Sequence, residues 1–163
     1  MSSHYLIEPL TESDAEILSD MLFHAVYVAP GTVPLSRAII KEPELARYVE
    51  DWGRVNDMGL KAIDSRDRKS VGAAWVRLLV GENKGYGYVD DDTPELSIAV
   101  LPDYRGRGLG TRLLNALFRL AREHHNAISL SVTKENPAKR LYDRLGFRVV
   151  SEQGSSLTMK KDL

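Results

Sequence analysis

A change in hydrophobic periodicity along residues 95–132 constrains the fold of this chain more than any other feature of its sequence. Residues 95–101 predict a strand, which Pro102 ends because proline cannot donate to the ladder of a sheet. A long helix is predicted from Gly106 onward, and residues 128–132 predict another strand. A strand, a helix and a second strand in this order indicate a right-handed parallel crossover. The helix is recognised by its apolar stripe, which consists of Leu109, Leu113, Leu117, Leu120 and Ala121.

The remaining chain adds further strands and helices. In chain order, the pattern predicts a strand over residues 5–10, a helix with apolar positions over 17–25, a second helix over 44–52, strands over 60–63 and 71–80, a loop over 81–93, a short helix over 137–145, and strands over 147–150 and 156–159. No internal repeat, linker or low-complexity tract divides the sequence. We therefore predict one α/β domain over residues 1–163, built on a mixed sheet.

Composition excludes several classes of function. The 163 residues are 43% apolar and 28% charged, which is typical of a globular domain. The 22 basic and 23 acidic residues give a net charge of −1, so the basic excess typical of nucleic-acid binding is missing. The absence of cysteine excludes disulfides, thiolate metal sites and a cysteine nucleophile. Because neither a secretory signal nor a membrane-spanning stretch is visible, we predict a cytoplasmic protein without a nucleic-acid or membrane partner.

The turn between the strand that ends at Leu101 and the following helix has three glycines in five residues. Such glycines weaken an ordinary helix start, but they suit a backbone that must approach a ligand closely. Amides at a helix N-terminus are unpaired, and the helix dipole favours an anion there. Arg105 and Arg107 add positive charge where a diphosphate would lie. The alternative is a glycine-rich connector with incidental arginines.

Two common phosphate-binding motifs do not fit this turn. A P-loop requires lysine and then serine or threonine after its last glycine, whereas Gly110 is followed by Thr111 and Arg112. A dinucleotide fingerprint that starts at Gly106 and Gly108 requires a third glycine at the position of Thr111. Both assignments are therefore excluded.

A third pattern fits. Arg105, Gly108 and Gly110 satisfy Arg/Gln-x-x-Gly-x-Gly/Ala, which resembles the acyl-CoA pyrophosphate loop of the GNAT superfamily of N-acetyltransferases. Residues 96–102 look like the fourth strand of that family, and residues 136–147 closely resemble its last conserved motif. Two motifs at the expected separation are more specific than either alone. The N-terminal part of the chain resembles the family only in the order of its elements.

The resemblance implies the GNAT fold, in which about four helices flank a mixed central sheet and the fourth and fifth strands splay apart. The pantetheine arm of CoA would lie between those strands and pair with the backbone of residues 98–100. The amides of residues 106–110 would hold the pyrophosphate together with Arg105, and Asn136 would contact the arm. The implied cofactor-binding residues are Ile98, Ala99, Val100, Arg105, Gly106, Arg107, Gly108, Leu109, Gly110 and Asn136.

Tyr142 is the candidate acid. Acyl transfer from a thioester to an amine needs a neutral amine, an oxyanion stabiliser and a proton for the leaving thiolate. Tyr142 occupies the position at which GNAT enzymes with a tyrosine acid place it, and a phenol with a pKa of about 10 can protonate a thiolate. The alternative is a packed tyrosine whose hydroxyl makes one structural hydrogen bond.

Glu95 is the candidate base, because many family members have a glutamate at a similar distance before the loop. Strand alternation puts Glu95, Ser97 and Ala99 on one face of the sheet. Glu95 would deprotonate the ammonium directly or through a water held by Ser97. The alternative is a solvated carboxylate at a strand end. In this family, a main-chain amide near residues 98–100 usually polarises the carbonyl.

Other polar and aromatic residues are weaker candidates. Adjacent residues on a helix point apart, so His124 and His125 predict no metal site. Trp75 is predicted to lie in the core. Tyr86 and Tyr88 would cover the acceptor, and the neighbouring acidic run would attract a cationic amine or form a solvated loop.

The sequence thus predicts an N-acetyltransferase that moves an acetyl group from acetyl-CoA, its co-substrate, to an amine of a small molecule or peptide, without a metal. The alternative is a non-catalytic acyl-CoA-binding sensor domain that kept the loop and lost the chemistry. The presence of both Tyr142 and Glu95 favours catalysis. The acceptor stays open among amino acids, polyamines, antibiotics and protein termini, and a homodimer stays open as well.

Overall fold

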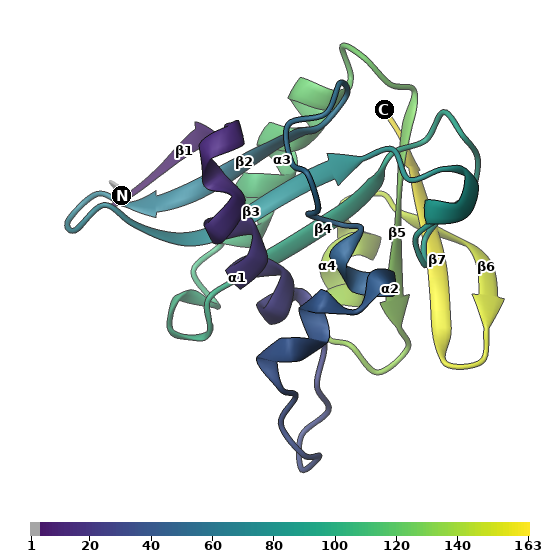
Figure 1. Ribbon diagram of the computed structural model, residues 1–163, viewed down its shortest axis with the longest axis horizontal. Coiled ribbons are helices and arrows are strands. Elements are labelled where there is room, and N and C mark those ends of the chain that lie inside the picture. Colours follow the sequence, from purple (N-terminus) through teal and green to yellow (C-terminus); the bar gives the residue numbers. More distant parts are fainter. Residues whose placement is uncertain (1–3) are drawn as a thin grey trace.

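The computed structural model describes residues 4–163, which form a seven-stranded mixed sheet with the strand order β1-β2-β3-β4-β5-β7-β6 (Figure 1). All neighbouring strands are antiparallel except β4 and β5. The mixed α/β architecture predicted from the sequence is therefore confirmed. The strands are β1 (Tyr5–Pro9), β2 (Met58–Asp64), β3 (Lys69–Arg77), β4 (Glu95–Val100), β5 (Ala127–Thr133), β6 (Arg148–Gln153) and β7 (Ser156–Asp162).

Helices cover both faces of this sheet. In Figure 1, α1 and α2 lie on the near face, and α3 and α4 lie behind the sheet. Short 3-10 turns occur at Glu12–Asp14, Arg37–Lys41, Gly81–Asn83 and Pro102–Tyr104. The helices are α1 (Ala15–Ala25), α2 (Pro43–Ala46), α3 (Leu109–Ala121) and α4 (Ala138–Arg144). No helix within residues 4–163 is long and apolar enough to cross a membrane.

Two hydrophobic clusters hold these layers together, one on each face of the sheet. The α3 stripe packs on one face with Leu96, Ile128 and Leu130, and the α1 residues pack on the other face with Trp75 and Ala99. Successive side chains of β4 therefore point to opposite clusters, as expected for a strand. Trp75 is fully buried, so its predicted place in the core is confirmed.

The predicted parallel crossover is confirmed, and its two strands separate. Within the described part of the chain, the only register pair between β4 and β5 is Glu95 with Ser129, at the start of β4. From that pair onward the strands diverge, so the β5-facing edge of residues 98–100 is left without a strand partner in residues 4–163. This is the splay that the family resemblance implied.

The second predicted helix is wrong in its C-terminal half. α2 ends at Ala46, and turns continue to Asp51, whose φ of +53° is incompatible with a helix. The backbone carbonyls beyond α2 accept hydrogen bonds from buried side chains of β3 instead of from helical amides. The apolar stripe that suggested a longer helix still packs on the α1 cluster, and it consists of Leu45, Tyr48, Val49 and Trp52.

Other predicted boundaries also move, and two of them bear on the site. The strand predicted over residues 71–80 ends at Arg77, and the long helix begins at Leu109 rather than at Gly106. The helix starts late because Gly106 and Gly108 have left-handed backbone conformations, which belong to a turn. Gly106 and Gly108 therefore precede the helix, and Gly110 is its second residue.

Candidate functional site

The turn between β4 and α3 exposes its backbone. Gly106 and Gly108 have φ values of +75° and +78°, and a Cβ atom at either position would meet no atom within 4 Å. Glycine is required here by the left-handed backbone, and the space beside it is open. Gly108 is the N-cap of α3, and its carbonyl accepts the first helical hydrogen bond from Arg112 N at 3.1 Å.

The amides of this turn are available to a ligand. Among the described residues, the backbone N–H groups of residues 106–111 have no backbone acceptor. Unpaired amides at the start of a 13-residue helix carry a partial positive charge that favours an anion. The residues therefore fit a phosphate group by their conformation and by the free space in front of them.

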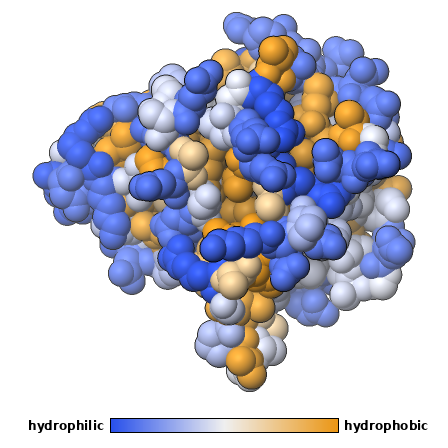
Figure 2. Space-filling model, viewed as in Figure 1, coloured by the Kyte–Doolittle hydropathy of each residue, from blue (hydrophilic) through white to orange (hydrophobic). Residues whose placement is uncertain are grey.

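A pocket of about 700 Å³ lies between this turn, the splayed edge of β4, α1 and α4. It brings together most of the residues that the sequence analysis selected for the cofactor. Apolar side chains from α1 and the segment after it form the opposite wall. Figure 2 shows hydrophobic side chains, coloured orange, on the loop that projects from the molecule. The selected residues that line the pocket are Ile98, Ala99, Val100, Arg105, Gly106, Gly108, Leu109, Gly110, Asn136 and Tyr142.

The two arginines of the turn are used differently. Arg105 lines the pocket, and its Nε donates to Val100 O at 2.9 Å, which fixes its side chain against the end of β4. The Arg107 guanidinium donates to the Tyr5 hydroxyl at 2.8 Å and to Asp103 O at 3.3 Å, and Arg107 does not line the pocket. The prediction that Arg107 contacts the cofactor therefore depends on its backbone amide rather than on its charge.

Asn136 connects the pocket wall to α4. Its Oδ1 accepts from Ala138 N at 2.9 Å, so the side chain caps the start of this helix while it lines the pocket. α4 packs closely against the start of α3, and a Cβ atom on Gly110 would lie only 3.3 Å from Leu141 Cδ2. The glycine at position 110 thus lets α3 and α4 approach each other.

Tyr142 is 8% exposed and lines the pocket. Its ring packs edge-on against Phe147, with 5.8 Å between ring centroids. Burial raises the pKa of Tyr142 to about 12, so the phenol keeps its proton at neutral pH. Its hydroxyl makes no hydrogen bond to another group of residues 4–163.

Glu95 is 4% exposed, so the alternative of a solvated strand-end carboxylate is wrong. Burial raises the pKa of Glu95 to about 7, against the opposing effects of a hydrogen bond from Tyr48, the Gly87 amide and the charge of Arg47. The Gly87 amide lies close enough to favour the charged form, yet Glu95 Oε1 has no well-formed hydrogen bond in the described part of the chain. A buried carboxyl group with a pKa near neutrality suits a proton acceptor.

Glu95 does not line the pocket. It lies three residues before Ile98, which at the usual rise of a strand is roughly 10 Å along β4. Ser97 lies between them and is half-buried. Its register partner on β3 is Trp75, which belongs to the α1 cluster, and Ala99 belongs to the same cluster. Glu95, Ser97 and Ala99 therefore share one face of β4, as predicted. Because Glu95 lies apart from the pocket, proton transfer through a water at Ser97 fits the distance better than direct transfer.

A loop covers Glu95, and the sequence analysis missed why its glycines are there. A Cβ atom on Gly85 would lie 2.2 Å from Glu95 Oε1, and one on Gly87 would lie 2.6 Å from the carbonyl carbon of Leu130. Only glycine permits this approach. The sequence analysis also missed Tyr48, and the alternating glycines of residues 85–88 were the one local signal of a tight contact.

The other candidates are not assembled with the pocket. Tyr86 is 62% exposed, and the Tyr88 hydroxyl donates to Asp91 at 2.6 Å, so the acidic run interacts with its own loop. His124 and His125 follow α3, which ends at Ala121. No group of three or more metal-ligating side chains occurs within the described residues 4–163.

Comparison with known proteins agrees with this geometry. The family model described as the Acetyltransferase (GNAT) family matches residues 36–147. The chain belongs to the GNAT acetyltransferase family.

Curated relatives share short segments with this GNAT protein. A ribosomal protein bS18-alanine N-acetyltransferase of Haemophilus influenzae is 38% identical over 78 residues, which are 44% of this chain and 53% of the relative. An N-alpha-acetyltransferase of Sulfurisphaera tokodaii is 47% identical over 58 residues, which are 34% of this chain and 35% of the relative. The chain thus covers less than two thirds of the length of either relative.

Solved structures match over nearly the whole chain. The PaiA N-acetyltransferase of Thermoplasma acidophilum, solved in complex with coenzyme A, has a TM-score of 0.69 at 19% identity and covers all of both chains. A ribosomal-protein-S5-alanine acetyltransferase of Vibrio fischeri has a TM-score of 0.66 at 16% identity, with 99% of this chain and 94% of that chain covered. These matches confirm the GNAT fold.

Proposed function

We propose that this GNAT protein transfers an acetyl group from acetyl-CoA to an amine. The observation that carries the proposal is the pocket of about 700 Å³, in which an open amide turn, the unpaired edge of β4 and a buried protonated tyrosine meet. These are the parts that binding a diphosphate, aligning an extended arm and protonating a leaving group require.

The residues present fit acetyl-CoA. The amides of residues 106–110 and the Arg105 guanidinium would bind its diphosphate. The edge of residues 98–100 that has no strand partner would bind amide groups of the pantetheine arm. Asn136, which lines the same pocket, has a side-chain NH₂ group to offer the arm. When bound, acetyl-CoA supplies an acetyl thioester.

Two residues of the chain would move protons. Glu95 Oε1 would accept a proton from the ammonium group of the acceptor through a water at Ser97, and the neutral amine would then form the new C–N bond. The Tyr142 hydroxyl would donate its proton to the sulfur as the C–S bond breaks, and its phenolate would regain a proton from the nitrogen of the new amide. A main-chain amide of residues 98–100 would polarise the carbonyl oxygen.

The acceptor is proposed to be an amine of a small molecule or a peptide. The pocket wall on the α1 side is mostly apolar and includes Phe23, Tyr27 and Leu35. Burial lowers the pKa of His24 in the same wall, which favours its neutral form. The relatives named for alanine of a ribosomal protein support peptide amines as the first acceptors to test. The predicted cytoplasmic location stays a prediction.

The competing proposal is a binding domain that senses acyl-CoA without turning it over. It requires the turn but gives no reason for a buried glutamate whose pKa is near 7 on the strand that forms the pocket edge. Catalysis gives this carboxyl group a role, so we favour it.

Release of free thiol from acetyl-CoA, measured with a panel of peptide and small-molecule amines, tests the proposal. We expect release that depends on at least one amine and yields the N-acetylated product by mass spectrometry. Tight binding of CoA in calorimetry, without thiol release above the amine-free rate for any panel member, would support the sensor instead.

A further inference from the structure

Tyr48 connects three separate segments of the chain at Glu95. Its hydroxyl donates to Glu95 Oε2 and accepts from Tyr86 N at 2.8 Å. The single phenolic proton is therefore committed to the carboxylate, and the amide of the covering loop occupies the other side of the oxygen. Tyr48 is 6% exposed, and burial together with the neighbouring carboxylate raises its pKa far above the usual value, so it remains a donor.

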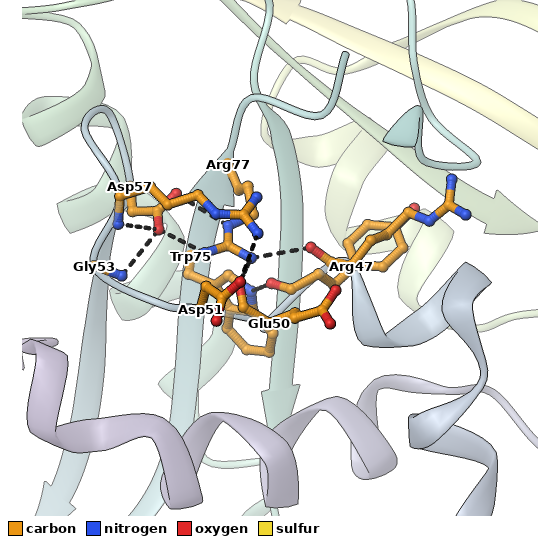
Figure 3. Close-up of polar contacts among 9 residues, drawn as sticks. Arg47, Glu50, Asp51, Gly53, Asp57, Trp75 and Arg77 are labelled. Atoms are coloured by element: carbon orange, nitrogen blue, oxygen red, sulfur yellow. Dashed lines mark hydrogen bonds and ion pairs between the residues drawn. The ribbon is translucent and has the colours of Figure 1, made fainter. Parts of the chain in front are cut away.

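Strand β3 holds the backbone of Tyr48 in place. Trp75 Nε1 donates to Tyr48 O at 2.9 Å. Arg77 Nη1 donates to Arg47 O at 3.0 Å and also to Glu50 O, on either side of Tyr48. Figure 3 shows both side chains reaching from β3 toward the segment after α2. This segment is thus tied to the sheet by three carbonyl contacts, which is why it leaves the helical path.

Arg77 is itself fixed by an ion pair. It is 1% exposed, and its Nε and Nη2 donate to Asp57 Oδ1 at 3.0 Å and Oδ2 at 2.6 Å. Asp57 Oδ2 also accepts from the amides of Gly53 and Arg54 at 3.0 Å and 2.9 Å (Figure 3). A bidentate, buried pair of this kind restricts the loop on both sides of Tyr48.

We propose that Tyr48 is a positioning residue for the base: it fixes Oε2 of Glu95 and leaves Oε1 as the oxygen that accepts the proton. This inference rests on the proposed function, because it assumes that Glu95 takes the proton of the amine. The orientation follows from the contacts, since Oε2 is occupied by Tyr48 while Oε1 has no well-formed hydrogen bond within residues 4–163.

The groups that face Glu95 set the direction of the expected effect. The segment after α2 contributes Tyr48 and the charge of Arg47, both of which favour the carboxylate. On β3, the Arg77 guanidinium is paired with Asp57, and on β5 the register partner Ser129 has a buried hydroxyl. The covering loop contributes backbone amides. Removal of the Tyr48 hydroxyl should therefore raise the pKa of Glu95 further.

Titration of the Glu95 carboxyl group by ¹³C NMR of glutamate-labelled protein tests this directly, with the resonance assigned by its loss in Glu95→Gln. Tyr48→Phe keeps the ring, and we expect the Glu95 pKa to rise by about 1 pH unit, the size of one hydrogen bond to a charged group. The acidic limb of kcat against pH should move upward by the same amount. Tyr88→Phe removes a hydroxyl from a different carboxylate, Asp91, and should leave the Glu95 titration unchanged.

Incorporation of a difluorinated tyrosine at position 48 gives a second readout if Tyr48→Phe folds poorly. Its more acidic hydroxyl is a stronger donor, so the Glu95 pKa and the acidic limb should both move downward. A Glu95 pKa that responds to neither change would overturn the positioning role and leave the proposed function intact. A Glu95 pKa that moves while the limb of kcat stays fixed would overturn the base assignment, and the positioning role with it.

Discussion

The two ends of strand β4 use glycine for opposite purposes. At the C-terminal end, Gly106 and Gly108 have positive φ values and open space around them. At the N-terminal end, Gly85 lies so close to Glu95 that a Cβ atom would be 2.2 Å from Oε1. One end therefore offers free backbone amides to a ligand, and the other buries a carboxyl group beneath a loop. If Glu95 is the base, cofactor binding and removal of the proton from the amine are separated along one strand.

The chemical step should show the largest effect. Tyr142→Phe keeps the ring packed against Phe147 and removes only the hydroxyl proton. We expect turnover to fall by about 10² to 10⁴, the range for a positioned acid, while CoA affinity measured by calorimetry changes little. Unchanged turnover would make Tyr142 a packing residue and would remove the acid from the pocket.

A negative charge placed in the turn after β4 tests whether this turn binds CoA. Gly108→Asp places a carboxylate beside the free amides, and we expect CoA to bind about 100-fold more weakly or not at all, so that the rise in Tm caused by CoA is lost. Gly154→Asp is the matched control, because Gly154 has a φ of +60°, open space around it and a place in the β6–β7 turn. If a folded Gly108→Asp protein kept normal CoA affinity, the turn would not be the diphosphate site.

Because Glu95 is buried at the N-terminal end of β4, the free energy of unfolding should depend on pH. A carboxyl group whose pKa rises from 4.5 to about 7 on folding binds its proton more tightly in the folded state. Its contribution to the free energy of unfolding is therefore largest below pH about 4.5 and is lost as the pH rises through 7. Because glutamine cannot ionise, the stability of Glu95→Gln relative to the parent should increase by roughly 2–3 kcal/mol across this interval.

Denaturant titrations of both proteins at several pH values measure this difference. A difference that does not vary between pH 4 and pH 8 would show that the Glu95 carboxyl group is not enclosed as the contacts at the N-terminal end of β4 require.

The smallest effect should come from Gly85, the glycine that packs against Glu95. Gly85→Ala adds a methyl group that must displace Glu95 or the loop, and we expect a loss of about 1–3 kcal/mol of stability in thermal or denaturant unfolding. Gly81→Ala is a useful control, because Gly81 has a φ of +64° and no atom within 4 Å, so that only backbone strain is added there. A larger loss at position 81 than at position 85 would contradict the close contact.

The sequence predicted the turn at the C-terminal end of β4 but not the contacts at its N-terminal end, and the reason is physical. The crossover, the turn and α4 are contiguous in the chain, so the periodicity and the glycine spacing of residues 95–147 specify them locally. The contact between Tyr48 and Glu95 joins residues 47 positions apart, and the Arg77–Asp57 pair joins residues 20 positions apart. No local pattern encodes such pairs.

The same tertiary contacts explain the main error in the predicted secondary structure. The helix after Pro43 ends at Ala46 because Trp75 and Arg77 bind the carbonyls that would have continued it. The helical spacing of the apolar residues correctly predicted that they pack on one cluster, but it wrongly predicted that their backbone is helical. The burial of Glu95 was likewise invisible, because it depends on the loop of residues 85–88 folding over it.

The pH dependence of kcat for the parent and Glu95→Gln, with the same saturating amine, tests the central claim that the enclosed carboxyl group is the base. If Glu95 takes the proton, the parent rate should level off above pH about 7, whereas the variant rate should continue to rise with the fraction of free amine. The ratio of the two rates should then fall about tenfold per pH unit between pH 7 and the pKa of the amine. A ratio that stays constant across this interval would contradict the claim and place the base elsewhere.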